Sequence, residues 1–429
     1  MLLSISSLVM LFSGYAIHIG LGRFLGPDEY GDYGVIIALW SCVNLVLTTG
    51  LPQAVSQNIA ANENKSESIL KSALLLQFAA LTIITVSYYL MAEPLALLLN
   101  DKALTPLIQL TAFIFPLNAI YSLFLGYYNG LHHFKRQAII DIVYGVSKVI
   151  FILSLVFIFK LNGAIFGFII AALFASIVSF HFPKQVQSYF SFKKLIIFSI
   201  PLIGFTIFLT LYQTLDLLFV KAFIHDGQSA GFYTASQNIA RLPLFAFSAL
   251  SLVLFPSISQ SVTQNDIERS RRLITHALRI IVLLLLPGVL LVSATSPRII
   301  TFIYAKEYLP AANSLAILIF GFGFLTLFTI LMNIINGAGT PYISLIISGI
   351  SLVICAISCV IWIPLLGLSG AALSNLVANM FGCIAAAIMV YKRFAVLLPA
   401  KSIIKICIAS FVLYILAKMI FIPVLLLPL

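Results

Sequence analysis

The sequence predicts an all-α polytopic membrane protein built from two six-helix lobes, and three observations support this prediction. Of the 429 residues, 62% are hydrophobic and only 9% are charged, whereas soluble domains average about 25% charged residues. Apolar stretches long enough to cross a bilayer recur along the whole chain. A weak internal repeat divides these stretches into two sets, so we expect one duplicated membrane bundle without an attached soluble domain.

A membrane-spanning helix needs about 20 mainly apolar residues. This criterion gives a first set of spans at 2–23, 31–53, 70–92, 105–128, 137–159 and 162–182. A second set follows at 194–220, 230–256, 273–296, 309–335, 341–363 and 368–391. Residues 402–418 are a candidate thirteenth span, and the run after them is too short to cross alone. The first stretch is interpreted as a membrane helix, because it lacks the basic start and cleavage site of a signal peptide.

Basic residues are distributed unevenly between the loops on the two sides. The loops after the even-numbered spans carry Lys65, Lys71, Lys135, Arg136, Lys184, Lys193, Lys194, Arg269, Arg271, Arg272, Lys392, Arg393 and Lys401. The opposite loops carry Arg23, Lys102, Lys160, Lys221, Arg298 and Lys306. Because cytoplasmic loops are enriched in Lys and Arg, the even loops and the N-terminus are predicted to be cytoplasmic. The net charge of +11 is therefore assigned to these loops and not to nucleic-acid binding.

The sequence contains no convincing metal site or catalytic arrangement. All five cysteines lie in apolar runs, and Cys355 and Cys359 have no histidine or carboxylate beside them. We interpret these two as small buried hydrophobic residues. The segment from Gly337 to Gly339 links two membrane spans and lacks the strand-to-helix context of a dinucleotide-binding loop. We therefore expect no metal, no organic cofactor and no enzymatic activity.

Residues 129–177 align without gaps onto 336–384 at a shift of 207, with 12 of 49 positions identical. Nearer the start of each half, Gly31 and Tyr33 align with Gly231 and Tyr233, and Pro52 aligns with Pro256. Six spans per half place both halves in the same orientation, as parallel repeats around a central cavity. The small residues Gly163, Gly370, Gly167 and Ser374 are predicted to allow close helix contact within each lobe.

This repeat sets the predicted domain organisation. An N-terminal six-helix lobe covers residues 1–185, and a C-terminal six-helix lobe covers 186–393. Residues 394–429 add one or two C-terminal membrane segments. Rocking of two such lobes would expose the cavity to each side of the membrane in turn.

The segment after the first span runs Arg-Phe-Leu-Gly-Pro-Asp-Glu-Tyr-Gly-Asp-Tyr-Gly over residues 23–34. It resembles the signature of bacterial polysaccharide flippases of the multidrug/oligosaccharidyl-lipid/polysaccharide (MOP) exporter superfamily, as do Gly50-Leu51-Pro52 and Asn129-Gly130. Physically, Gly26-Pro27 ends a helix and forms a turn, and Asp28 and Glu29 complement the dipole of the next helix. The chain departs from the family pattern at Met1, which stands almost directly in the first span without a basic amphipathic lead, so the predicted N-terminal orientation rests on the other loops.

The resemblance implies transport of undecaprenyl-diphosphate-linked sugars, for O-antigen, lipopolysaccharide, capsule or a related glycan, to the outer leaflet of the bacterial inner membrane. It also implies partners: the lipid-linked oligosaccharide, the bilayer, and a glycan polymerase with a chain-length regulator.

Polar residues inside the predicted spans are the candidates for substrate contact, because charged side chains there cost about 2.5–3.5 kcal/mol and usually face a cavity or a partner. Lys148 and Arg241, one per lobe, are predicted to attract a diphosphate and acidic sugars. The same polar cavity is predicted to include Tyr144, Tyr233, Gln237, Asn238 and Gln213. The alternative is internal ion pairing of Asp141 with Lys148 and of Asp216 with Arg241.

Asp216, Asp141 and His18 are candidates for coupling transport to H⁺ or Na⁺. For Asp216 and His18, a purely structural role as a buried, hydrogen-bonded polar side chain is an equally supported interpretation. Asp141 lies near the cytoplasmic interface, which favours structural pairing.

Two other functions compete with the flippase. A cation-coupled multidrug or small-solute exporter of the same architecture needs acidic groups at the cavity centre, where this sequence places Lys148 and Arg241. A membrane glycan polymerase or ligase usually has a long extracytoplasmic loop with catalytic residues. The odd loops here do not exceed about a dozen residues, which argues against an enzyme of that kind.

Overall fold

The computed structural model describes residues 2–183, 189–264, 266–396, 406, 408–416 and 418, and within these ranges it contains helices and no β-strand. This confirms the predicted all-α class. The predicted basic positions Lys184 and Lys401 lie outside the described residues, as does the side chain of Pro256. Of the candidate thirteenth span, residues 406, 408–416 and 418 are helical, and the rest lies outside the description.

Nine helical runs in the described part of the chain have the length and apolar composition needed to cross a membrane. They are Leu2–Ala61, Glu63–Leu90, Leu104–Gly130, Phe134–Ser179, Phe192–Phe223, Ile267–Ala294, Ala311–Gly337, Tyr342–Leu366 and Leu368–Phe394. The protein is thus a multi-pass membrane protein. Two of these runs each contain two predicted spans, because the helix is interrupted only at a single residue, Gly26 in the first and Lys160 in the second.

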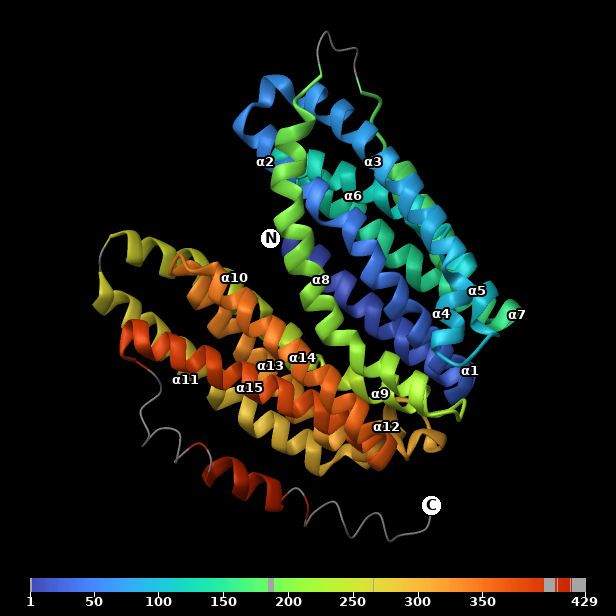
Figure 1. The fold of residues 1–429 in the computed structure, drawn as a ribbon, viewed down its shortest axis with the longest axis vertical. Helices are drawn as coiled ribbons and strands as arrows, with labels where there is room; N and C mark the ends of the chain where they lie inside the picture. Colours follow the sequence, from blue (N-terminus) through green and yellow to red (C-terminus); the bar gives the residue numbers. More distant parts are fainter. Residues whose placement is uncertain are drawn as a thin grey trace. The chain divides into compact units, whose positions relative to one another are not determined.

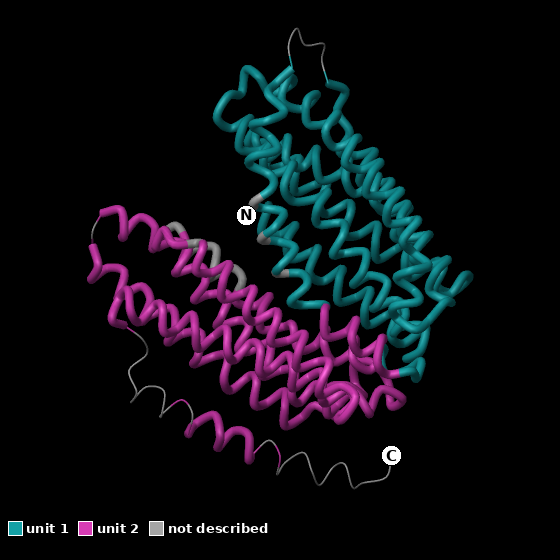
Figure 2. Tube along the Cα trace, viewed as in Figure 1, with its two compact units in different colours: residues 1–214, 225–231 teal, residues 215–224, 232–429 magenta. Residues whose placement is uncertain are grey.

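The chain forms two compact units, shown in different colours in Figure 2. Unit 1 contains Met1–Thr214 and His225–Gly231, and unit 2 contains Leu215–Ile224 and Phe232–Leu429. The predicted lobe boundary at 185–186 lies outside the described residues. The compact units instead divide the chain within α8 (Phe192–Phe223) and α9 (Ser229–Ala240).

Contacts of α8 explain why most of this helix belongs to unit 1. Gly50 lies so close to Ile203 that a Cβ atom there would be 2.5 Å from the Cγ1 atom of that side chain. Thr214 is the last residue of the unit 1 portion of α8, and its Oγ1 is 3.5 Å from Cys42 Sγ. The first helix of the second half therefore contacts the first half at two points along its unit 1 portion.

Unit 1 is built mainly from seven helices (Figure 1). They are α1 (Leu2–Thr48), α2 (Gly50–Ala61), α3 (Ser66–Leu90), α4 (Ala92–Leu98), α5 (Leu104–Thr111), α6 (Ile114–Gly130) and α7 (Phe134–Ser179), with a short 3₁₀ turn, η1 (Glu63–Lys65). α1 packs along α7, and α6 packs against both α2 and α7. The second predicted span ends at residue 53, but the helix continues to Ala61 because a helix need not stop where its apolar stretch leaves the bilayer.

Unit 2 repeats this arrangement with later elements (Figure 1). They are α10 (Leu242–Thr263), α11 (Ile267–Ala294), α12 (Ser296–Ile303), η2 (Lys306–Tyr308), α13 (Ala311–Gly337), α14 (Pro341–Leu366) and α15 (Leu368–Phe394). α13 packs against α10 and α11 as α6 packs against α2 and α3. The repeated packing supports the duplication that the sequence indicates.

The backbone shows the repeat at single residues. Lys160 has φ 49° and ψ −131°, and Gly367, its counterpart at the shift of 207, has φ 58° and ψ −134°. Just beyond these turns, a Cβ atom on Gly163 would overlap the carbonyl of Leu155, and one on Gly370 would overlap the carbonyl of Trp362. The predicted role of these two glycines in close helix contact is therefore confirmed.

Candidate functional site: two intramembrane polar clusters

The predicted polar residues form two clusters, one in each unit, which we name after their central charged residues. The Lys148 cluster of unit 1 consists of Lys148, Tyr144, Asp141, Tyr121 and Asn118. The Asp216 cluster of unit 2 consists of Asp216, Tyr233, Gln237, Arg241, Asn375 and Asn379.

Lys148 is a half-buried cation set among aromatic rings. Its Nζ lies 4.9 Å from the ring centroid of Tyr144 and 5.3 Å from that of Phe168. Among the described residues, no carboxylate forms an ion pair with it. Contacts of this kind contribute about 2 kcal/mol when desolvated, but they leave the positive charge uncompensated. The lysine therefore keeps the capacity to bind an anion.

The remaining residues of the cluster hold Tyr144 in place. The Tyr144 hydroxyl donates to Asn118 Oδ1 at 3.1 Å, and its ring packs 4.7 Å from that of Tyr121. Tyr121 in turn donates to Asp141 Oδ1 at 2.6 Å. Among the described residues, the structure shows no ion pair between Asp141 and Lys148, and the carboxylate accepts the Tyr121 hydroxyl.

Asp216 is fully buried and accepts hydrogen bonds on both carboxylate oxygens. Oδ2 accepts from the Tyr233 hydroxyl at 2.7 Å and from Asn375 Nδ2 at 3.0 Å. Oδ1 accepts from Gln237 Nε2 at 2.9 Å and from the backbone N–H of Leu217 at 2.9 Å. Four donors therefore satisfy both carboxylate oxygens inside an apolar bundle.

Gln237 connects Asp216 with Arg241, which is half-buried. Its amide nitrogen donates to Asp216 as above, and its Oε1 accepts from Arg241 Nη2 at 3.0 Å. The guanidinium carbon of Arg241 also lies 5.8 Å from the ring centroid of Phe322. The predicted association of Asp216 with Arg241 therefore includes a bridge through an amide side chain.

Several predicted site residues have other surroundings. Tyr233 is completely buried and Tyr144 is 5% exposed, and both hydroxyls are hydrogen-bonded. In this structure these rings position charged neighbours and are not open to a sugar. Asn238 is buried, whereas Gln213 is half-buried in the unit 1 part of α8. His18 lies apart from the Lys148 contacts, with Nδ1 3.1 Å from the Tyr30 hydroxyl and its ring 5.8 Å from that of Tyr33.

Three amide residues of the clusters were not among the predicted candidates. Asn118 lies in α6, and Asn375 and Asn379 lie four residues apart in α15. Asn379 Nδ2 donates to Asn375 Oδ1 at 2.8 Å, which places both on one helix face next to Asp216. Polar amides spaced by one helical turn inside apolar spans are a signal that the sequence contains, because intramembrane polar residues usually face the protein interior.

Cys355 and Cys359 are 1% and 0% exposed, which confirms their interpretation as buried small residues. Among the described residues, no group of three or more His, Cys, Asp or Glu side chains is arranged to hold a metal ion.

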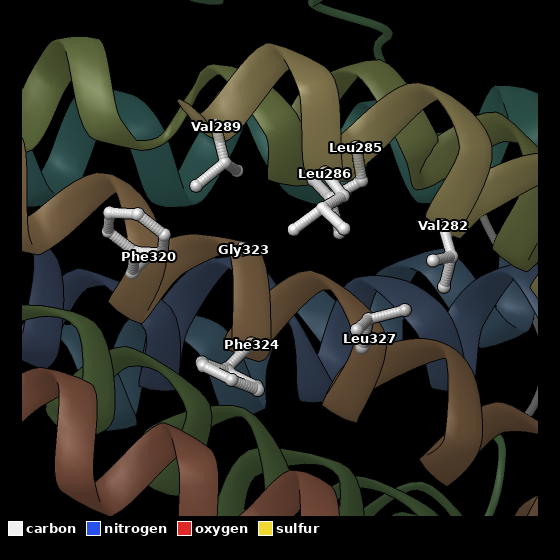
Figure 3. Close-up of a pocket in the computed structure, with 8 residues that line it drawn as sticks. All are labelled: Val282, Leu285, Leu286, Val289, Phe320, Gly323, Phe324 and Leu327. Atoms are coloured by element: carbon white, nitrogen blue, oxygen red, sulfur yellow. The ribbon is translucent and has the colours of Figure 1, made fainter. Parts of the chain in front are cut away.

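An apolar pocket of about 90 Å³ lies within unit 2, between α11 and α13. Figure 3 shows Val282, Leu285, Leu286 and Val289 facing the α13 residues across it. The α13 side of the pocket is formed by Phe320, Gly323, Phe324 and Leu327. Since none of these side chains is polar, the pocket offers nothing that recognises a diphosphate or a sugar.

Two family models match the chain. The family described as polysaccharide biosynthesis protein matches residues 2–262, and the MatE family matches residues 201–362. Among curated relatives, stage V sporulation protein B of Bacillus subtilis (strain 168) is 22% identical over 344 residues, which cover 72% of this chain and 64% of the relative. The uncharacterized membrane protein YabM of the same strain is 23% identical over 296 residues, or 62% of this chain and 54% of the relative. The matched region thus spans less than two thirds of either relative.

Solved structures share the fold at low sequence identity. An inward-facing multidrug resistance MATE family transporter of the MOP superfamily has a TM-score of 0.80 at 13% identity, covering 90% of this chain and 94% of that one. The lipid II flippase MurJ, in an inward closed conformation, has a TM-score of 0.78 at 16% identity, covering 98% and 97%. The fold is therefore that of MOP superfamily transporters. With a family model that spans residues 2–262, more than half of the chain, the chain belongs to the polysaccharide biosynthesis protein family.

Proposed function

We propose that the protein flips a lipid-linked oligosaccharide from the cytoplasmic to the outer leaflet by alternating access, as a transporter and not an enzyme. Membership of the polysaccharide biosynthesis protein family supports the substrate class. The observation that carries the proposal is Lys148, an intramembrane cation that lies between two aromatic rings without a carboxylate partner among the described residues. An uncompensated cation in a bundle suits a substrate whose head group is a diphosphate.

The finer assignment follows from the same chemistry. We propose an undecaprenyl-diphosphate carrier, with a repeat unit of O-antigen, capsule or a related surface glycan. Lys148 of unit 1 would contact the phosphates, with Gln213 as a further polar contact, and Arg241 is the candidate cation of unit 2. Tyr144 and Tyr233 act as positioning residues, because their hydroxyls are hydrogen-bonded to Asn118 and Asp216. The lipid tail would stay in the bilayer.

The proposed setting is the bacterial inner membrane, with the N-terminus in the cytoplasm. The bias of basic residues toward the even-numbered loops supports this orientation. A glycan polymerase and a chain-length regulator are the expected partners, since a flipped repeat unit has to be polymerised to form a surface glycan.

A substitution series at Lys148 tests the proposal in a strain that lacks the native gene. Deletion is expected to deplete surface glycan and to accumulate lipid-linked repeat units on the cytoplasmic leaflet. Lys148→Met keeps the apolar stem and removes the charge, so transport should fall at least tenfold with unchanged membrane insertion. Lys148→Arg keeps the charge and should retain most transport. Normal glycan export by Lys148→Met would contradict the assignment of this residue.

A cation-coupled exporter of small solutes is the second candidate, and two observations favour it. The MatE family model matches residues 201–362, and this range includes the buried carboxylate Asp216. Expression in a drug-sensitive strain separates the two candidates. Raised resistance to cationic drugs without any effect on surface glycan would support the exporter.

Ion coupling is compatible with either candidate, and we propose Asp216 as its centre. The carboxylate is fully buried and is linked through Gln237 to Arg241, so a change in its ionisation would alter a network of side chains from three helices. Asp141 and His18 are weaker candidates, because each is engaged by a tyrosine hydroxyl away from such a network. Transport assays under an imposed H⁺ or Na⁺ gradient identify the coupled ion.

A further inference from the structure

Two open cavities occur at turns between long helices, one in each unit. The first lies at the turn from α6 to α7, with a volume of about 570 Å³, and is lined by His132, His133, Phe134, Lys135, Arg136 and Ile139. The second lies at the turn from α13 to α14, with a volume of about 310 Å³. Thr340, Tyr342, Met389, Lys392 and Arg393 are among the residues that line it. Each cavity is lined by one lysine and one arginine.

The two turns are the same place in the duplicated fold. At the shift of 207, His132 corresponds to Gly339, and both have positive φ angles, 57° and 85°. The second turn has no basic residue of its own. Its charge comes instead from the end of α15, because Arg393 Nη2 donates to the carbonyl oxygen of Ala338 at 2.7 Å. A basic turn is therefore present in both halves but is built from different residues.

The cations of both cavities are uncompensated by acidic side chains. In the parts of the chain that the structure describes, no carboxylate forms an ion pair with Lys135, Arg136, Lys392 or Arg393. The Arg136 guanidinium lies 4.4 Å from the ring centroid of Tyr128. Arg393 uses one of its five N–H groups on Ala338. Donors therefore remain available in both cavities.

Exposed apolar side chains stand beside these cations. Phe134 is 42% exposed and Ile139 48% in the first cavity, and Tyr342 is 62% exposed in the second. The turns lie at the ends of helical runs long enough to cross a membrane. A binding site for a free phosphate ion would need only the basic side chains and no apolar rim. Basic residues with an apolar rim at this position match the phosphate and the first acyl carbons of a phospholipid.

We propose that these two turns are binding sites for the head groups of anionic phospholipids, one site in each unit, in the leaflet that contains the basic loops. The phosphate contacts the Lys–Arg pair, and the acyl chains lie along the exposed aromatic residue. Because each site belongs to one unit, each unit is anchored to the same leaflet by its own lipid.

Native mass spectrometry of the purified full-length protein with added phosphatidylglycerol tests this proposal. The wild type should retain two phosphatidylglycerol molecules that phosphatidylcholine does not replace. Lys135→Gln with Arg136→Gln should remove one of them, and Lys392→Gln with Arg393→Gln the other. Removing two interfacial charges should weaken binding roughly 30-fold at the altered site. Inorganic phosphate at the same concentration should displace neither lipid.

Two control variants test whether a general loss of positive charge or a loss of folding would explain the same result. Lys65→Gln with Lys193→Gln removes the same charge from exposed residues of other even-numbered loops and should keep both lipids. Lys392→Arg with Arg393→Lys keeps the charge and should also keep both, which controls for loss of folding. Equal binding of phosphatidylcholine, displacement by inorganic phosphate, or equal losses in the Lys65 and Lys193 control would each overturn the proposal. Lipid binding is measured without transport, so the result is independent of the proposed flippase activity.

Discussion

At the scale of single residues, Lys160 occupies a backbone conformation that suits glycine. Its φ of 49° and ψ of −131° match those of Gly367, its counterpart in the second half. A side chain in this region costs about 1–3 kcal/mol. The compensation within the described structure is an exposed ion pair, with Nζ 3.4 Å from Glu29 Oε1, and pairs of this kind contribute little. The duplicated turn therefore carries strain in one copy only.

Lys160→Gly is predicted to stabilise the protein by up to about 1 kcal/mol, because relief of the strained φ exceeds both the loss of an exposed ion pair and the added entropy of the unfolded chain. Thermal unfolding in detergent should show a rise in Tm. Lys160→Ala removes the same ion pair but keeps the Cβ atom, so its Tm should not rise. An equal rise in Tm for both variants would show that the lysine side chain, and not the backbone conformation at residue 160, lowers the stability of the wild type.

Asp216→Asn is predicted to destabilise unit 2 by about 1–3 kcal/mol. In the variant, an NH₂ group replaces one of the two carboxylate oxygens. This NH₂ group would face the two donors that bind that oxygen in the wild type, which are either Tyr233 and Asn375 or Gln237 and the Leu217 N–H. If Asp216 is the coupling group, the variant should also lose any dependence of transport on an imposed H⁺ or Na⁺ gradient. Asp101→Asn, in the loop between α4 and α5, is the control, because this carboxylate is only half-buried. Unchanged gradient dependence in Asp216→Asn would exclude this residue from coupling.

At the scale of helices, the family signature at residues 23–34 acts as a turn followed by a close crossing. Gly26, with φ 73° and ψ 176°, breaks α1 where the sequence predicts a turn. Five residues later, a Cβ atom on Gly31 would lie 2.5 Å from the backbone nitrogen of Gly231. A Cβ atom on Gly231 would overlap the carbonyl of Pro27. The two glycines that align in the repeat therefore pack against each other within unit 1.

Gly231→Ala is predicted to cost at least about 2 kcal/mol, because the added methyl group meets backbone atoms that cannot rotate away. Expression and Tm in detergent are the measurements. Gly14→Ala in α1 is the matched control, since no heavy atom lies within 4 Å of the added Cβ atom. That substitution should raise stability by up to about 1 kcal/mol through helix propensity. Similar Tm values for the two variants would contradict the close crossing.

Hydropathy and periodicity predict helices well here, but they do not predict partners. Each predicted span in the two sets of six overlaps a described helix, since burying backbone polar groups in lipid leaves few other options. Lys148 and Asp216 were identifiable as charges in apolar spans. Asn118 comes from the preceding helix, and the packing of α6 against α7 brings it to Tyr144. Asn375 lies 159 residues from Asp216 in the sequence, and only the fold of unit 2 brings these two together. The charge of the α13–α14 turn likewise comes from α15.

At the scale of the whole molecule, duplication predicts that equivalent loops of the two halves lie on the same side of the membrane. Lys102 and Lys306 lie in the loops after the third and ninth predicted spans, and Lys65 and Gln264 lie in the loops after the second and eighth. All four are exposed. Six spans per half return the chain to its starting side, and the bias of basic residues places Lys65 in the cytoplasm.

Single cysteines at these four positions, in a background without native cysteines, test this topology with a membrane-impermeant maleimide. Lys102→Cys and Lys306→Cys are expected to react on intact cells, because both loops are predicted to face outward. Lys65→Cys and Gln264→Cys should react only after permeabilisation. Reversal of all four would invert the orientation but keep the parallel repeat. Opposite labelling within an equivalent pair would instead mean that the halves are inserted upside-down, and a parallel duplication could not produce that pattern.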